Sequence, residues 1–512
     1  MSAADVEVEV LIVGGGPVGL TARALLDRWG VRVMVVEKYG ELSPFPRSRL
    51  VNVRSMEIFR QLGLADTITA RAFAADYGRI RFRDTLQDRD FATAAMIGIN
   101  APIPESPAIG AITSQDRLEP TLLAASDAPV RFGVELIDLV EEPESVVAVL
   151  VDHGVETRVR ARYVLAADGA NSTVRRRLGI DTAGPGALGA VTTVVFDADL
   201  DRWCADQPAG VYFTAHGSFV PLYPEGGWAW FGPTPEDPER TDWSDLVSRT
   251  IGSDRAVPTE VLRVQHWVMN AFVAERFGRG RILLAGDAVH AIPILGGLGM
   301  NTGIADVHNL CWKLAGVLRG WAAANLLETY EAERLPVAQL TLQQAVTNAR
   351  IAGQAQNRRR SQRRNGAPES DVDLPWSDQF FAQLGLVLGV AYRSAAVITD
   401  GSTPPNTGTD YVPVPKAGHR LPHLWLTPTR STLDTLGEWF TLLTPDPASW
   451  AQPVPWPVHV EPLPGDQLYD LGPNGALLVR PDGYIAAHWS DRPRNAALQE
   501  ALTTITRATF PE

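Results

Sequence analysis

The stretch Val10-Leu11-Ile12-Val13-Gly14-Gly15-Gly16-Pro17-Val18-Gly19 decides the fold, because an apolar strand runs directly into a glycine-rich turn. Residues 20–29 then have helical spacing, and a second apolar run, residues 31–36, ends in Glu37. This succession of strand, G-x-G-x-x-G turn, helix, strand and acidic residue is typical of a dinucleotide site. The segment therefore predicts the first βαβ unit of a doubly wound α/β sheet.

Each glycine of this turn has a separate physical role. Gly14 permits the tight turn, Gly16 allows the backbone to approach a pyrophosphate, and Gly19 lets the helix pack on the strand. The helix N-terminus offers unpaired N–H groups to phosphates, and a carboxylate at the end of the second strand can accept hydrogen bonds from a ribose. We therefore expect the nucleotide to be held by Gly14, Gly16, Pro17, Val18, Gly19, Glu37 and Lys38.

A second glycine-rich segment lies about 270 residues further along the chain. Residues 281–285 form a short apolar strand that ends in Gly286-Asp287, and Pro293 precedes Gly299-Met300-Asn301 at the start of a predicted helix over residues 301–318. The carboxylate can meet the ribityl or pyrophosphate part of a flavin, and the helix dipole would stabilise negative charge on the flavin ring. Two separate turns suggest one long cofactor held at two places, and the candidate is FAD.

Two stretches between these turns also have glycine-containing motifs. Residues 163–167 form an apolar strand before Asp168-Gly169 and a basic helix start, which alone would fit any βα junction. Gly184-Pro185-Gly186-Ala187-Leu188-Gly189 matches G-x-G-x-x-G, but no apolar strand precedes it and residues 191–196 look like a strand. We therefore predict a loop over residues 184–189 and a single dinucleotide fingerprint in the chain.

In order and spacing, these motifs resemble those of the FAD-dependent aromatic hydroxylases typified by p-hydroxybenzoate hydroxylase, over about residues 6–345. Asp168-Gly169 matches the DG motif, which in that family serves both FAD and the nicotinamide donor, and Gly286-Asp287 matches the GD motif. The chain is most similar to bacterial hydroxylases that tailor aromatic polyketides, such as aklavinone and angucycline hydroxylases. Residues 46–49 and 114–119 are also similar to segments of these hydroxylases. The resemblance implies further FAD contacts from Arg47, Gln115, Asp168, Gly286, Asp287, Pro293, Gly299, Met300 and Asn301, and a solvated loop is the alternative for Arg47 and Arg49.

The same resemblance implies a chemistry. A bound FAD would take electrons from transiently bound NADPH or NADH and use O2 to form a flavin C4a-hydroperoxide, which hydroxylates a polycyclic aromatic substrate of the polyketide type. Because the cofactor carries this chemistry, we expect no catalytic side chain, and only the backbone of Pro293 as a candidate contact. The alternatives are Baeyer–Villiger, epoxidising or oxidative-rearrangement chemistry on a similar substrate and, more remotely, a flavin reductase, a dehydrogenase or a non-catalytic flavin-binding protein.

The alternation of strands and helices predicts three parts. Residues 1–70, 110–180 and 278–345 read as a doubly wound FAD-binding sheet, and residues 71–109 and 181–277 as an inserted, mostly antiparallel sheet that covers the substrate. Residues 346–400 read as a helical linker. Aromatic residues of the inserted sheet could line the substrate chamber or simply form its core: Phe219, Tyr223, Trp228, Trp230 and Trp267.

Residues 401–512 predict a small α/β domain, and related hydroxylases carry a thioredoxin-like domain at this place. No cysteine follows Cys311, so a C-x-x-C redox function is excluded. Packing or homodimer contacts are the expected role of this domain. Strands are expected at residues 420–426, 440–443 and 476–479, after a Pro/Gly-rich linker over residues 401–415.

Charge and composition exclude several other classes of protein. A formal net charge of −13 disfavours nucleic acid and anionic membranes as partners. His419 and His423 are four residues apart, but Pro422 between them spoils a helix, so we expect no metal site. The chain begins without a basic and apolar leader, and we expect it to be cytoplasmic.

Overall fold

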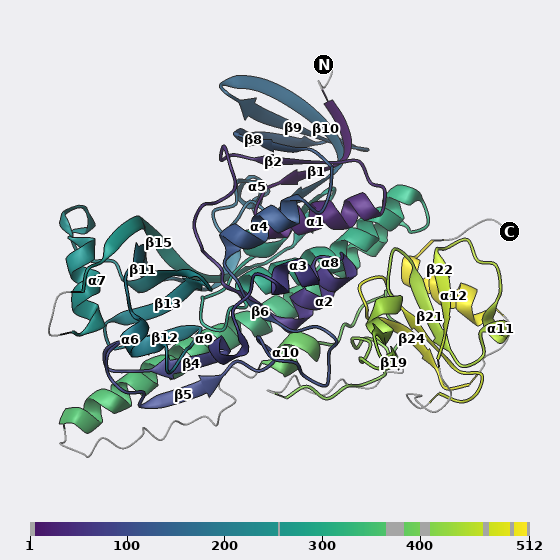
Figure 1. Cartoon of the computed structure of the whole chain (residues 1–512). Helices are drawn as coiled ribbons and strands as arrows, with labels where there is room; N and C mark the ends of the chain where they lie inside the picture. The colour runs from purple at the N-terminus through teal and green to yellow at the C-terminus, as the bar shows by residue number, and fades with distance from the viewer. Residues whose placement is uncertain are drawn as a thin grey trace.

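The computed structural model describes residues 6–253, 257–364, 383–399, 410–463, 471–491 and 496–508. Its first sheet is mainly parallel and has the strand order β16-β17-β10-β1-β2-β7 (Figure 1). β8 (Val134–Glu141) and β9 (Val146–Asp152) form an antiparallel hairpin, and β9 pairs antiparallel with β10. The remaining strands are β1 (Val6–Val13), β2 (Val33–Glu37), β7 (Val130–Phe132), β10 (Val155–Ala166), β16 (Gly278–Arg279) and β17 (Ile282–Leu284).

Helices cover this sheet as the sequence predicts. α1 (Pro17–Arg28) follows β1 and packs against the long helix α8 (Gly299–Arg319). Val10, Leu11 and Ile12 are fully buried, because both faces of a parallel sheet are covered by helices. The shorter helices of this part are α2 (Val53–Gln61), α3 (Ala65–Thr69), α4 (Gln115–Leu123) and α5 (Thr173–Arg177), and the small strands β3 (Leu50–Val51) and β6 (Ala111–Ile112) pair with each other.

The second sheet is the predicted, mostly antiparallel one, with the order β18-β15-β11-β14-β13-β12-β4-β5. Only the pair of β12 and β4 is parallel. α6 (Asp201–Cys204) and α7 (Trp243–Ile251) belong to the same region. The strands are β4 (Arg79–Phe82), β5 (Ala92–Ala95), β11 (Thr182–Asp197), β12 (Val211–Thr214), β13 (Gly217–Tyr223), β14 (Gly226–Pro233), β15 (Glu260–Ala274) and β18 (His290–Ala291).

The prediction of a loop over residues 184–189 is wrong. This glycine-rich stretch forms the first half of β11 and pairs with the long strand β15. Its pairing slips twice, between Ala183 and Gly186 and between Ala187 and Gly189, and Gly184, Gly186 and Gly189 have positive φ angles of 144°, 77° and 153°. Glycine accommodates such bulges, and the long partner strand supplies the pairing that local sequence preference did not indicate.

One helix crosses a domain boundary that the sequence suggests. α9 (Glu328–Arg364) is 37 residues long and runs past position 345 to the second sheet, where Arg359 pairs with Asp84. Of the predicted linker, residues 365–382 lie outside the described residues, and the short helix α10 (Leu384–Leu388) follows them. None of the helices in the described ranges is long and apolar enough to cross a membrane.

The C-terminal part contains a four-stranded sheet with the order β22-β21-β23-β24. Its core includes Trp450 and Leu502 and continues onto Trp312 of α8. The strand predicted over residues 420–426 is reduced to β19 because Pro422 cannot donate to a strand ladder, and most of the predicted 401–415 linker lies outside the described residues. The elements are β19 (Trp425–Thr427), β20 (Arg430–Ser431), β21 (Phe440–Thr444), β22 (Val458–Pro462), β23 (Ala476–Val479), β24 (Ile485–Trp489), α11 (Pro447–Trp450) and α12 (Ala497–Thr506).

Candidate functional site

The first glycine turn has the geometry that its sequence predicts. Gly14 has a φ of +109°, and a Cβ atom there would lie 2.3 Å from the carbonyl oxygen of Ala167, the residue that follows the neighbouring strand β10. A Cβ on Gly19 would lie 2.0 Å from the carbonyl oxygen of Gly14. At Gly16, in contrast, a Cβ would meet no protein atom within 4 Å. Two glycines therefore serve close packing within the protein, whereas Gly16 borders open space.

The start of α1 and the end of β2 face this space. Gly16 is the N-cap residue of α1 and provides no side-chain cap, so the first N–H groups of the helix are available to a ligand. Glu37 accepts hydrogen bonds from the N–H groups of Gly15 at 2.7 Å and Tyr39 at 3.0 Å. These bonds hold the carboxylate against the glycine turn, where a ribose of a dinucleotide would lie.

The second turn places one unpaired carboxylate at the wall of an interior cavity. Asp287 lies in the 3₁₀ turn Gly286–Ala288, and its side chain reaches the interior cavity described below. Among the described residues it has no hydrogen-bond partner, and burial raises the pKa of Asp287 above its usual value. A hydroxyl donor from a ligand would satisfy this carboxylate.

A buried network that the sequence did not indicate supports the turn. Asp306 of α8 accepts a hydrogen bond from the Gly286 N–H at 3.1 Å, and its two oxygens contact His290 Nε2 at 2.6 Å and Arg334 Nε at 2.8 Å. Burial raises the pKa of Asp306, but His290 and Arg334 together bring it below its usual value. A paired anion therefore fixes the backbone that presents Asp287.

The Asp168-Gly169 loop is tied to the same turn. Asp168 Oδ2 accepts from the N–H groups of Thr173 at 2.8 Å and Val174 at 3.1 Å, whereas its Oδ1 is buried without a partner. Arg175 donates to the carbonyl oxygens of Ala170 at 2.8 Å and Ala288 at 2.7 Å. This arginine, to which the sequence assigned no role, therefore joins the two aspartate loops.

Asn301 supports the loop that precedes α8. Its Nδ2 donates to the carbonyl oxygens of Gly297 at 2.6 Å and Leu50 at 2.8 Å, and its Oδ1 accepts from the Asn52 N–H at 2.9 Å. The helix itself begins at Gly299 without a side-chain cap. Asn301 thus fixes the loop, and the uncapped helix end offers its N–H groups to a ligand.

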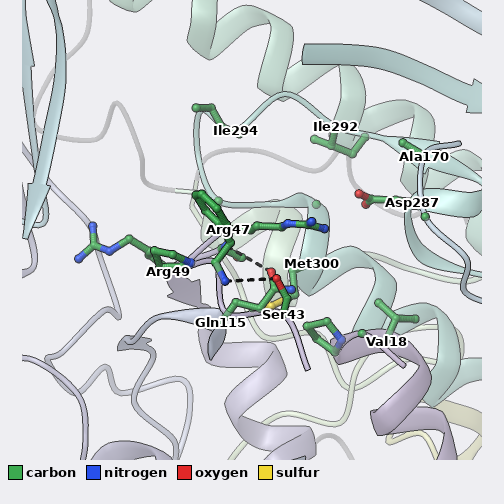
Figure 2. A pocket seen from close by; sticks show the side chains of 18 of the residues that line it. Val18, Ser43, Arg47, Arg49, Gln115, Ala170, Asp287, Ile292, Ile294 and Met300 are labelled. Carbon is green, nitrogen blue, oxygen red and sulfur yellow. Dashed lines mark hydrogen bonds between the residues drawn. The ribbon is translucent and has the colours of Figure 1, made fainter. Parts of the chain in front are cut away.

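One cavity of about 1460 Å³ connects these elements with the second sheet (Figure 2). Of the residues predicted to bind cofactor or substrate, thirteen line it: Gly14, Gly16, Pro17, Val18, Glu37, Lys38, Arg47, Gln115, Asp168, Asp287, Gly299, Met300 and Trp267. Those that do not line it are Gly19, Gly286, Pro293, Asn301, Phe219, Tyr223, Trp228 and Trp230. The cavity therefore unites segments that are far apart in the sequence.

Glu119 is a further polar group of the cavity wall. Its Oε1 accepts from Gln115 Nε2 at 2.7 Å, and its Oε2 accepts from the Ser43 N–H at 3.2 Å. Burial raises the pKa of Glu119 to about 7. Glu119 belongs to a sequence segment similar to that of the hydroxylases, but nothing in the sequence indicated that its carboxyl group would be buried.

One face of the second sheet lines the cavity, and the largest aromatic side chains of the sheet lie on the other face. Phe219, Trp228 and Trp230 belong to a core on the opposite face of the sheet. Their strand neighbours line the cavity instead, because side chains alternate between the faces of a sheet; these are Ser218, Val220 and Phe231.

Two other aromatic residues of this sheet lie differently. Trp267 lines the cavity and donates from Nε1 to Thr193 Oγ1 at 3.0 Å. Tyr223 donates from its hydroxyl to Asp116 Oδ2 at 2.7 Å and lies under the guanidinium of Arg117. Trp267 is therefore the member of the predicted aromatic set that a ligand in the cavity can contact.

The donor set fits FAD. Two uncapped helix ends and the open space at Gly16 suit a pyrophosphate, Glu37 suits a ribose, and the unpaired oxygens of Asp168 and Asp287 suit further ligand donors. Because all of these features face one continuous cavity, a single elongated cofactor can satisfy them together.

Comparison with known proteins agrees with this geometry. Residues 7–345 match the FAD binding domain family, and residues 414–508 match the family described as aromatic-ring hydroxylase, C-terminal. The chain belongs to the FAD-dependent aromatic hydroxylases. It is 34% identical to an aklavinone 12-hydroxylase of Streptomyces peucetius, over 90% of this chain and 96% of that protein. It is also 34% identical to a tetracenomycin A2 monooxygenase-dioxygenase of Streptomyces glaucescens, over 98% and 97%.

Solved structures show the same architecture. The flavin-dependent monooxygenase PieE, in complex with FAD and substrate, superposes with a TM-score of 0.90 at 31% identity, over 99% of this chain and 100% of that chain. These findings confirm the predicted α/β fold class, the FAD cofactor and the aromatic hydroxylase family.

Proposed function

We propose that this hydroxylase uses NADPH or NADH and O2 to hydroxylate a polycyclic aromatic compound of the polyketide type. The observation that carries the proposal is the single cavity, which has both FAD-type loops on one side and the second sheet on the other. Relatives named for aklavinone and tetracenomycin A2 support the substrate class. When bound, FAD would supply the redox chemistry and the activation of oxygen.

The residues would divide this work among them. Gly16, Pro17, Val18 and the start of α1 would hold the pyrophosphate, with Glu37 and Lys38 at the adenosine end. Asp287, Gly299 and Met300 would meet the ribityl and ring portions. We retain as further cofactor-contact or cofactor-positioning proposals Gly14, Gly19, Arg47, Gln115, Asp168, Gly286, Pro293 and Asn301.

The chain's own contribution to the reaction is placement and exclusion of water. Apolar side chains from three separate elements face the cavity, among them Ile80 of β4, Phe213 of β12 and Leu384 of α10. A planar aromatic ring enclosed by such walls loses its contact with water and is held in a narrow range of orientations. Trp267 would contact the substrate, and no side chain is assigned as an acid or base.

The division into domains belongs to the same proposal. Residues 1–70, 110–180 and 278–345 would bind FAD, residues 71–109 and 181–277 would cover the substrate, and residues 346–400 would connect them to a thioredoxin-like unit over residues 401–512. A cytoplasmic location, a homodimer, and the lack of nucleic-acid and membrane partners stay predictions.

The proposed reaction is tested with protein reconstituted with FAD. Oxidation of NADPH and NADH is followed with and without hydroxylated anthraquinones, and products are analysed after reaction under ¹⁸O2. We expect an aromatic compound to stimulate nicotinamide oxidation and one ¹⁸O atom to appear as a ring hydroxyl. An inserted ester oxygen or an epoxide, identified by NMR, would support the alternative oxygenations, and turnover without ¹⁸O in the product would indicate a reductase.

A further inference from the structure

One wall of the cavity contains a cation that neither the cofactor nor the proposed reaction explains. Arg49 lines the cavity together with Met96, Ile112, Gly210 and Val211, which we call the Arg49 lobe. Figure 2 shows the Arg49 side chain extending away from Val18 and Asp287. The guanidinium therefore lies on the side of the cavity opposite the FAD-type turns.

The guanidinium of Arg49 is largely unsatisfied. Nη1 donates to the Gly210 carbonyl oxygen at 3.0 Å, and the group lies near the ring of Phe73. Nε and Nη2 are buried and have no hydrogen-bond partner, and no carboxylate pairs with Arg49, within the described part of the chain. Burial lowers the pKa of Arg49 to about 9, so the group still carries its charge at neutral pH. An unpaired cation at a buried position is costly to the fold.

Other buried arginines of this chain are satisfied. Arg23 and Arg175 donate to backbone carbonyl oxygens, and Arg420 and Arg480 contact carboxylates. Arg420 contacts Glu57 through Nε and Nη2, the same edge that is free in Arg49. That edge presents two parallel N–H donors and suits bidentate binding of a carboxylate. Arg49 thus has an unused carboxylate-binding edge in the wall of a ligand cavity.

We propose that Arg49 is a specificity-determining residue that binds an anionic oxygen, a carboxylate or an acidic enolate or phenolate, on the aromatic substrate. The proposal rests on the proposed function and narrows its substrate class to compounds with such an oxygen at the end remote from the reacting ring. Both free nitrogens are covered in the present rotamer, and rotation about the terminal bonds of the side chain would bring them to the ligand. The apolar Arg49 lobe accepts the ring system, and the cation selects its acidic group.

The experiment uses anthraquinone-2-carboxylate and its neutral isostere anthraquinone-2-carboxamide as probes. Each is titrated into FAD-loaded protein, and binding is followed by quenching of tryptophan emission. We expect the wild type to prefer the carboxylate by about tenfold or more, as for a charged bidentate pair. Arg49→Gln should reduce this preference to less than about threefold by weakening carboxylate binding alone, and Arg49→Lys should restore part of it. Arg131→Gln, which removes a partly exposed arginine paired with Asp152, serves as the matched control and should leave the dissociation constants of both probes unchanged.

Three outcomes would overturn the proposal. The first is that the wild type binds the two probes equally or binds neither. The second is that the preference for the carboxylate survives in Arg49→Gln. The third is a loss of more than about 5 °C in the melting temperature of ligand-free Arg49→Gln, since that would make the arginine a structural element. Nicotinamide oxidation and ¹⁸O incorporation are measured separately, so a protein that fails in those assays but keeps the Arg49-dependent preference contradicts only the proposed function.

Discussion

Two regions of the molecule gather charged side chains, and they differ in how those charges are paired. Beneath the C-terminal sheet, Arg480 donates to Glu333 at 2.6 and 2.9 Å and to Asp482 at 3.0 Å, and Lys313 donates to Glu333 at 2.8 Å. In the cavity, Arg49, Asp168 and Asp287 each have at least one group without a partner. We call the paired set of Arg480, Glu333, Asp482 and Lys313 the interface network. The difference separates charges that hold the protein together from charges that await a ligand.

The pKa shifts follow the same division. Burial raises the pKa of Glu333, but Arg480 and Lys313 together bring it far below its usual value. At Asp287 the effect of burial prevails and the pKa is raised. Mutual pairing thus stabilises the ionised form of Glu333, whereas the ionised form of Asp287 depends on what binds beside it.

The largest expected effect comes from breaking the interface network. Arg480→Met leaves Glu333 and Asp482 buried with only Lys313 as a cation, and should lower the free energy of unfolding by about 3–5 kcal/mol. The measurement is urea unfolding followed by tryptophan emission. Arg28→Met, which removes a more exposed pair with Glu438, is the control and should cost less than about 1 kcal/mol.

If Arg480→Met lowers the free energy of unfolding by less than about 1 kcal/mol, the interface network contributes no more than a surface pair. That result would contradict the distinction between structural charges and charges that await a ligand. Loss of the C-terminal transition alone, with the remainder unfolding as before, would show that the network stabilises the junction with the FAD-binding part.

The sequence predicted the parts of this picture that depend on local patterns. Apolar runs predicted β1, β10 and β17, and the glycine spacing located the turn before α1. It did not predict which face of the second sheet meets the cavity, because alternation shows that two faces differ but not which one covers a ligand. Networks such as Asp306 with Arg334 were missed because their members meet only in the folded chain.

The second prediction concerns pH and the cavity wall. The folded pKa of Glu119 is about 7 and its ordinary value is 4.5, so the cofactor-free folded protein retains a proton that the unfolded chain releases. The resulting stabilisation is complete below pH 4.5 and is lost as the pH rises to about 7, by at most about 3 kcal/mol. We expect the difference in unfolding free energy between wild type and Glu119→Gln to change across this window and to be constant above it. A flat difference from pH 4.5 to 7.5 would show that Glu119 ionises normally.

The third prediction compares two glycines of one turn. Gly19→Ala places a methyl group against the Gly14 carbonyl and should cost about 1–3 kcal/mol of stability with or without FAD. Gly16→Ala meets no protein atom, so it should leave the cofactor-free stability within about 1 kcal/mol while weakening FAD binding about tenfold or more. Unfolding curves and FAD titrations measure both effects. FAD binding unchanged in Gly16→Ala would mean that the open space beside Gly16 is not where the cofactor lies.

The smallest expected change in free energy comes from removing the unpaired carboxylate of Asp287 in the second turn. Asp287→Ala should weaken FAD binding by about tenfold or more, or about 1.4 kcal/mol, and yield protein purified with little FAD. Its cofactor-free stability should not fall, because the carboxylate has no partner in the described residues to lose. Absorbance at the flavin band and unfolding of the cofactor-free protein give the two numbers.

Asp306→Ala is the matched variant, because it removes a carboxylate from the same region that does have partners. It leaves His290 and Arg334 without their shared anion and frees the Gly286 N–H, so stability should fall in the cofactor-free protein. If Asp287→Ala keeps full FAD occupancy, or destabilises the cofactor-free protein as much as Asp306→Ala does, Asp287 belongs with the structural charges. The unpaired carboxylate would then no longer indicate the position of the cofactor.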